Sequence, residues 1–162
     1  MTVHDNPAAS AIDATQLRSP ITRAGYEYWL GKKGDRRFPA RADFDPLLEQ
    51  PLLARSMVLV EVRRQPLDFR YRLIGSAVRA NMNADWTGRW MSDIPMQCSP
   101  NPIWQHHEWV LEHKAPRFYR PTNLGPNKIS RSIESAQLPL GPDDDTIDMM
   151  MVFVDFVVKA VV

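Results

Sequence analysis

The order of strand-like and helix-like segments constrains this chain most. Residues 56–64, SMVLVEVRR, are rich in β-branched residues, and residues 67–75, LDFRYRLIG, alternate apolar side chains with arginine. The pair predicts a β-hairpin. Three more strand-like segments follow residue 116, in RFYRP, ISRSIESAQLPL and TIDMMMVFVDFVV. This order predicts an α+β fold with a five-stranded, mostly antiparallel sheet, whose helices are inserted between strands two and three and cover one face.

Prolines and capping residues mark where the helices begin. Ser19–Pro20 and Asn101–Pro102 each pair a good N-cap with a proline at the first helical position. They predict helices that end near Gly31–Gly34 and at Pro116, and Asp45–Pro46 repeats the signal before a short turn. We divide the chain into a disordered tail at 1–18, an N-terminal helical extension at 19–54 and a main domain at 55–160.

The charge balance argues against a nucleic-acid-binding domain. The chain has 20 basic and 19 acidic residues, a net charge of +1 and a pI near 7.9, whereas such domains are usually strongly basic. Arg70 and Arg72 are expected to pair with acids of the sheet such as Glu61 or Glu134, because arginine binds carboxylates in bidentate geometry.

Other features indicate the compartment. The longest apolar run, Met149–Val154, is too short to cross a membrane. The first ten residues, MTVHDNPAAS, lack the pattern of a secretory signal. The single Cys98 fits a reducing environment, and we therefore expect a cytoplasmic protein without membrane contact.

Four short motifs carry a resemblance to a known family. They are Tyr26-x-Tyr28-Trp29 in the first helix, Asp45-Pro46 after it, Phe69-Arg70-Tyr71-Arg72-Leu73-Ile74-Gly75 at the second strand and Trp86-Thr87-Gly88-Arg89 in the next loop. With them, residues 22–158 resemble the PAS domain, specifically stand-alone bacterial PAS proteins with a preceding Tyr-x-Trp helix. The sequence departs from the family at Asn81-Met82-Asn83, where the helix often ends in glycine.

The resemblance implies that residues 55–160 are a PAS domain, a sensory or signalling module without catalysis of its own. Such a module binds a small molecule between the sheet and the inserted helices, or dimerises, and it passes a signal by protein–protein interaction. We expect the pocket lining to comprise Tyr71, Leu73, Met82, Trp86, Trp90, Ile103, His107, Met149 and Met151. Methionines suit an adaptable pocket, and they equally fill ordinary cores.

The first helix is the expected homodimer interface. Its apolar surface is wider than one stripe, because Tyr26, Trp29 and Leu30 lie beyond the face that packs on the domain. Aromatic surface that remains exposed favours contact with another chain. A further signalling protein is the second expected partner.

Two alternatives stay open. A completely filled core would make the chain a ligand-free dimerisation or docking module. A haem sensor would hold iron through one histidine of the long helix, His106 or His107, as haem-binding PAS domains do.

Other chemistry is not expected. The spacing of the helix histidines, seven residues from His106 to His113, does not suit zinc. Cys98 lacks the sequence context of flavin-binding light sensors. There is no Gly-rich phosphate loop and no G-x-S-x-G motif, so we expect neither a cofactor nor an enzyme.

Overall fold

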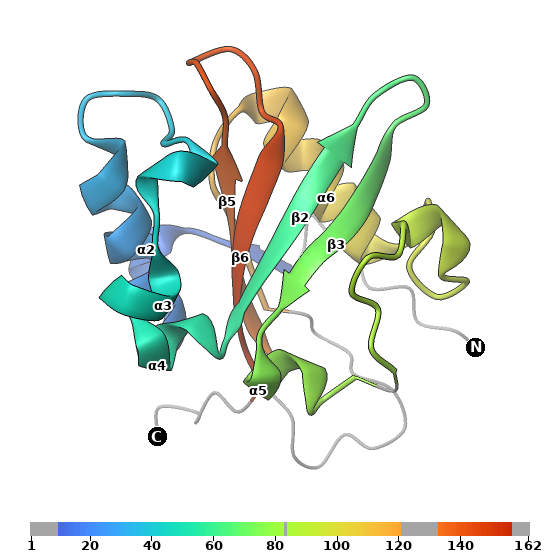
Figure 1. Ribbon diagram of the computed structural model, residues 1–162, viewed down its shortest axis with the longest axis horizontal. Helices are drawn as coiled ribbons and strands as arrows, with labels where there is room; N and C mark the ends of the chain where they lie inside the picture. Colours follow the sequence, from blue (N-terminus) through green and yellow to red (C-terminus); the bar gives the residue numbers. More distant parts are fainter. Residues whose placement is uncertain (1–9, 83, 121–132, 157–162) are drawn as a thin grey trace.

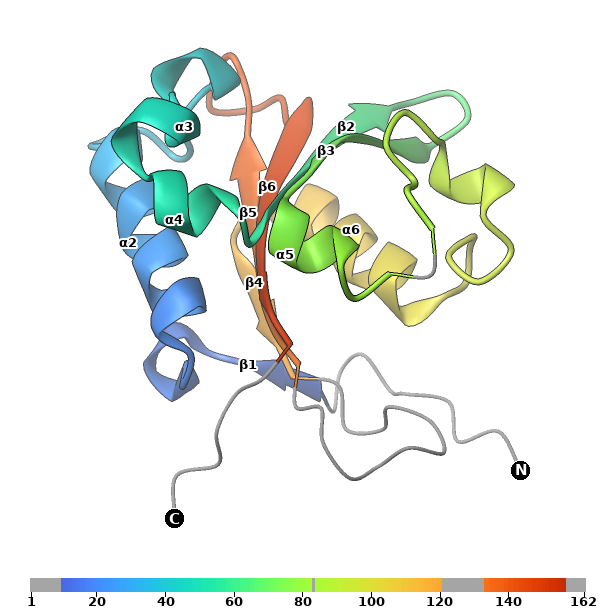
Figure 2. The ribbon, with the colours of Figure 1, turned by 60° about the horizontal axis from the view of Figure 1, so that its bottom comes forward.

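The computed structural model describes residues 10–82, 84–120 and 133–156. Within them, an antiparallel sheet lies between two layers of helices (Figures 1 and 2). The strands are β1 (Ala11–Ile12), β2 (Met57–Arg63), β3 (Asp68–Ile74), β4 (Arg117–Tyr119), β5 (Glu134–Leu140) and β6 (Met149–Asp155). The α-helices are α2 (Pro20–Lys33), α3 (Pro46–Glu49), α4 (Pro51–Ala54), α5 (Ser76–Arg79) and α6 (Pro102–His113). Short 3₁₀ turns are η1 (Ala14–Gln16), η2 (Arg41–Asp43) and η3 (Met91–Asp93).

The sheet has the strand order β1-β4-β5-β6-β2-β3, and every neighbouring pair is antiparallel. The predicted hairpin is confirmed as β2 and β3, and α5 and α6 lie between β3 and β4 in the chain. The α+β class is therefore confirmed. The start of the fourth predicted strand, residues 129–132, lies outside the described residues.

The sheet has one strand more than the five predicted, because residues 10–18 are ordered. Ala11 and Ile12 pair with β4 as strand β1. The backbone N–H groups of Arg18 and Ser19 donate to the Glu134 carboxylate over 3.1 and 3.0 Å. These partners lie more than a hundred positions away, so residues 10–18 carry no local periodicity that would predict them. The rest of the predicted tail, residues 1–9, lies outside the described residues.

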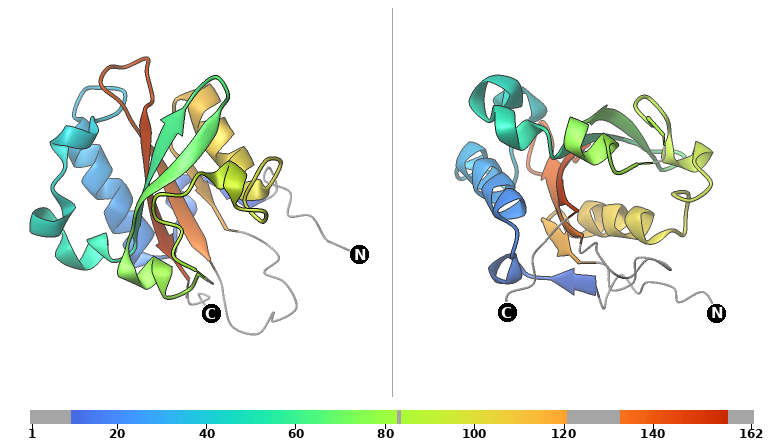
Figure 3. Two further views of the ribbon diagram at one scale, coloured as in Figure 1. Left: turned by 45° about the vertical axis from the view of Figure 1, so that its right-hand side comes forward. Right: turned by 90° about the horizontal axis from the view of Figure 1, so that it is seen from below.

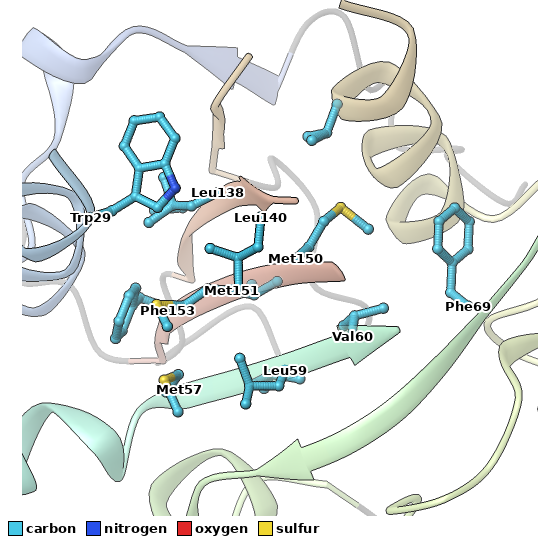
Figure 4. Packing of buried hydrophobic residues seen from close by; sticks show 14 of the residues in the cluster. Trp29, Met57, Leu59, Val60, Phe69, Leu138, Leu140, Met150, Met151 and Phe153 are labelled. Carbon is cyan, nitrogen blue, oxygen red and sulfur yellow. The ribbon is translucent and has the colours of Figure 1, made fainter. Parts of the chain in front are cut away.

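Helix α2 covers one face of the sheet. The hydroxyl of the N-cap Ser19 accepts a hydrogen bond from the N–H of Ile21 over 3.0 Å. On the same helix, the indole N–H of Trp29 donates to the Pro139 carbonyl of β5 over 2.9 Å. Figure 4 shows Trp29 directed at the residues of β5 and β6. In Figure 3, α2, α3 and α4 lie on one side of the sheet and α5 and α6 on the other. The sheet is therefore buried on both faces.

Alternation along β6 divides its side chains between the two layers. Successive residues of a strand point to opposite faces. Val152 points towards α6, where it lines a cavity. Phe153 points towards α2, where a methyl group added at Gly25 would meet its ring. At this strand, only the thickness of the sheet separates the cavity from α2.

Candidate functional site

A cavity of about 710 Å³ lies between the sheet and the helical layer that contains α5 and α6. Its size is within the range of small-molecule sites, about 300–1,000 Å³. Strands β2, β3, β5 and β6 form one wall, and α5, the loop after it and the first turns of α6 form the other. The lining residues are Val58, Val60, Tyr71, Val78, Asn81, Met82, Trp86, Ile94, Pro95, Met96, Gln97, Asn101, Pro102, Ile103, His107, Tyr119, Ile133, Ser135, Gln137, Val152, Val154 and Phe156.

Three buried polar side chains line this cavity. Ser135 and Gln137 are two residues apart on β5 and so share its inner face, and His107 comes from α6. Their exposed fractions are 1%, 0% and 2%. Among the described residues, no hydrogen-bond partner is present for either ring nitrogen of His107, the Ser135 hydroxyl, or the Gln137 amide nitrogen and oxygen. We call these three residues the polar trio.

The His107 ring is neutral at physiological pH. Burial lowers its pKa to about 4, and the nearby amide of Gln137 opposes this shift without outweighing it. The ring packs edge-on against Phe69, with centroids 4.9 Å apart, which fixes its orientation. A neutral imidazole carries one N–H donor and one nitrogen acceptor. His107 therefore offers the cavity both kinds of hydrogen-bonding group.

The rest of the lining is uncharged as well. Among the lining residues described, none is Asp, Glu, Lys or Arg. The Tyr71 hydroxyl donates to the Gln97 side chain, and burial raises the pKa of Tyr71, which keeps it protonated. The Asn101 side chain accepts from the N–H of Ile103 over 2.8 Å as the N-cap of α6. Among the described lining residues, the polar trio thus supplies the buried side-chain hydrogen-bonding groups that have no partner.

The two histidines that the sequence left equivalent are different in the structure. His106 is outside the cavity lining and stacks on Tyr119 at 3.8 Å between centroids. Its Nε2 lies 3.4 Å from the Ser10 hydroxyl, and its Nδ1 accepts from Arg117 over 3.3 Å. Burial, assisted by the charge of Arg117, lowers the pKa of His106 to about 3. Of the three histidines that the structure describes, His107 alone lines the cavity and could offer a ring nitrogen to an iron there.

Five of the nine predicted pocket residues lie in the cavity wall: Tyr71, Met82, Trp86, Ile103 and His107. They come from β3, the loop after α5, and α6. The cavity lies between the sheet and the helices, and its use as a ligand pocket stays a prediction.

Three predicted residues lie on the opposite face of the sheet. Met149 and Met151 alternate with Val152, which lines the cavity, so they face the α2 side. Leu73 is displaced by a bulge, because Leu59 pairs with Leu73 while the next residue pairs with Tyr71. The extra residue in β3 reverses the alternation.

Trp90 is the fourth correction. Its ring lies under two guanidinium groups, Arg63 at 4.0 Å and Arg70 at 5.0 Å from the ring centroid. Trp90 forms an isolated bridge with Arg70. Cation–π contact with neighbouring strand residues holds this indole outside the cavity lining.

The predicted dimer surface on α2 also requires correction. Trp29 is 1% exposed and belongs to the core of its own chain. Tyr26 is half-buried, and its ring packs edge-on against Phe118 at 4.9 Å. Of the three predicted residues, Leu30 alone is exposed. The aromatic residues of α2 are used to cover the sheet.

The arginines of the hairpin are paired, as predicted. Arg70 lies 2.6 Å from the Glu61 carboxylate, and Arg72 lies 3.8 Å from the same group. Arg120 lies 3.0 Å from Glu134.

In the part of the chain that the structure describes, no group of three His, Cys, Asp or Glu side chains is placed to hold a metal ion.

Ser135 and Gln137, the most informative lining residues, were not predicted from the sequence. Both are polar residues in a strand whose seven positions are all buried. The sequence signal for them was their spacing of two residues, with the apolar Ala136 between them and Leu138 after them. A buried strand with polar side chains at alternate positions indicates a polar inner face.

Comparison with known proteins adds a family match. A family model described as "PAS domain" matches residues 17–151 of the chain. No curated protein and no solved structure matches the chain. Among the described residues, no helix has the length and apolar character needed to span a bilayer.

Proposed function

Because the chain belongs to the PAS domain family, a family of sensory and signalling modules, we propose that it is a non-catalytic sensor. In this proposal the cavity binds a small molecule, and the bound state is passed on by contact with another protein. The observation that supports it most is the polar trio. Each buried hydrogen-bonding group left without a partner costs about 1–3 kcal/mol, and a ligand that pairs with the trio removes this cost.

The position of the cavity suggests how occupancy affects the rest of the molecule. The inner faces of β5 and β6 line the cavity, and their outer faces contact α2. On β6, Val152 faces the cavity while Phe153 lies against Gly25 of α2. A ligand shifts a conformational equilibrium by its difference in affinity for the two states. In our proposal, ligand contact with this wall changes the packing of α2.

A ligand-free docking module is the second candidate. It is favoured by three exposed leucines on the short helices beside α2. Leu47, Leu48 and Leu52 are 72%, 81% and 82% exposed. Exposed apolar groups of this kind mark contact surfaces in many proteins, and a second copy of the chain is the partner that we would test first.

Native mass spectrometry of the purified full chain tests the sensor proposal. We expect a fraction of the protein to carry a non-covalent small-molecule adduct. The variant Ile103→Trp places an indole at a half-buried lining position of α6 and should lose the adduct. Leu111→Trp is the matched control, because Leu111 is half-buried on the same helix and outside this cavity lining.

The outcomes separate the candidates. An apo mass throughout, or an adduct that persists in Ile103→Trp, contradicts the sensor proposal. A dimer in light scattering that Leu48→Ser and Leu52→Ser together convert to a monomer, combined with an apo mass, supports the docking module. A Soret band after haem supplementation, lost in His107→Ala and retained in His106→Ala, would identify a haem sensor.

A further inference from the structure

We propose that the cavity selects an uncharged molecule with an apolar, largely planar body and one edge that carries both a hydrogen-bond donor and an acceptor, as in a primary amide. The polar trio receives that edge. The inference rests on the proposed small-molecule function and adds the chemical class of the ligand.

The absence of charge in the lining carries the first part of the inference. The described lining residues include no Asp, Glu, Lys or Arg, and His107 is neutral because burial lowers its pKa to about 4. A charged ligand group placed here would lose its hydration without an opposite charge to pair with, which is strongly unfavourable. The site therefore favours a neutral ligand over its ionised analogue.

The chemistry of the polar trio carries the second part. The Gln137 amide has an N–H₂ donor and a carbonyl acceptor on one planar group. Among the described residues neither atom has a hydrogen-bond partner, although the amide lies close enough to His107 to affect the pKa of that ring. His107 adds one donor and one acceptor, and the Ser135 hydroxyl serves as either. A ligand edge with only acceptors would leave acceptor atoms of the trio unpaired, and an edge with only donors would leave its donors unpaired. An edge with both satisfies the site.

The remaining lining determines the body of the ligand. Aromatic rings of Tyr71, Trp86, Tyr119 and Phe156 line the cavity together with valines of β2 and β6. Such rings stack on flat apolar groups, and the cavity volume of about 710 Å³ leaves room for a bicyclic body. A flat apolar ligand is thus held by the walls and oriented by the trio.

Three probes of one shape test this class directly: 2-naphthamide, 2-naphthoate and 2-methylnaphthalene. They share an aromatic body and differ at one edge. The edge of the amide is neutral and carries a donor and an acceptor, that of the naphthoate is anionic, and that of the methylnaphthalene is apolar. In isothermal titration calorimetry, the wild-type chain should bind the amide with at least about tenfold higher affinity than either analogue. This difference corresponds to roughly one well-made hydrogen bond.

Variants locate the preference within the cavity. Gln137→Leu should reduce the amide's advantage over 2-methylnaphthalene to less than about threefold, because the main partner of the edge is removed. Ser135→Ala is the smaller change and should reduce it partly. Gln105→Leu is the matched control: Gln105 is exposed on α6 and outside the lining, so this variant should keep the full preference.

The results distinguish failure of the class from failure of the function. If 2-methylnaphthalene or 2-naphthoate binds as tightly as the amide, the cavity is a ligand site and the proposed class is wrong. If none of the three binds, the proposed class is wrong, and the sensor proposal is then decided by the adduct in native mass spectrometry: an adduct lost in Ile103→Trp upholds it, and an apo mass contradicts it. Because the comparison of probes uses the wild-type chain, it holds even where a variant fails to fold.

Discussion

Two glycines of helix α2 provide a matched test of how this helix packs on the sheet. A methyl group added at Gly25 would lie 2.3 Å from Cδ2 of Phe153, whereas one added at Gly31 would meet no atom within 4 Å. Both glycines lie within α2, and neither is among the positive-φ residues. The same substitution, glycine to alanine, therefore changes packing at one position and leaves it unchanged at the other.

The expected magnitudes follow from this geometry. Alanine is favoured over glycine in a helix interior by about 1 kcal/mol, so Gly31→Ala should stabilise the fold by up to that amount. At Gly25 the ring must move by about 1 Å to reach ordinary contact at 3.4 Å. Phe153 is fully buried, and such overpacking costs about 1–3 kcal/mol. Gly25→Ala should therefore be about 1–3 kcal/mol less stable than Gly31→Ala.

Chemical denaturation of both variants, followed by circular dichroism, measures this difference. For a chain of this length it corresponds to roughly 2–12 °C in melting temperature. A Gly25→Ala variant that is as stable as Gly31→Ala would refute the close packing of α2 on β6, and with it the route by which we expect ligand occupancy to reach α2.

Two further predictions concern buried ionisable groups. Glu134→Ala should lower the unfolding free energy by about 3–5 kcal/mol, because it leaves Arg120 without its carboxylate partner. Glu61→Ala, which removes a half-exposed ion pair, should lower it by less than about 1 kcal/mol. Equal losses of the two variants in denaturation would contradict the assignment of Glu134–Arg120 as the buried, stabilising pair. Burial lowers the pKa values of His106 and His107 to about 3 and about 4. Between these values and the ordinary histidine pKa of about 6.5, the unfolded state binds more protons than the folded state. The unfolding free energy should therefore fall as the pH drops through this range. His107→Gln should reduce this loss, and an unchanged pH dependence would show that His107 is not buried in its neutral form.

The fold was predictable because its signals are local. The β2–β3 hairpin is encoded by alternation over neighbouring residues, and the starts of α2 and α6 by a cap followed by proline. Strand β1 was not predictable in this way. It is held by β4 and by hydrogen bonds between Glu134 and the backbone at Arg18 and Ser19, groups that are distant in the sequence.

The cavity was predictable in place and only partly in detail. Assigning a residue to one face of a strand requires its exact register, and the bulge in β3 moved Leu73 to the other face. Met151 was assigned to the pocket by its residue type, although alternation with Val152 places it against α2. Ser135 and Gln137 were missed because the sequence shows their alternate spacing but neither their burial in β5 nor their lack of partners among the described residues, which are properties of the fold.

The most direct test of the account is the response of the His107 ring to the amide probe. Long-range ¹H–¹⁵N correlation spectra report the protonation and hydrogen bonding of each histidine ring. On titration with 2-naphthamide at pH 7, we predict that the His107 ring nitrogens shift while the ring stays neutral, and that the exposed His113 is unaffected. Saturating binding that leaves the His107 resonances unchanged would contradict the central claim that the polar trio receives the ligand.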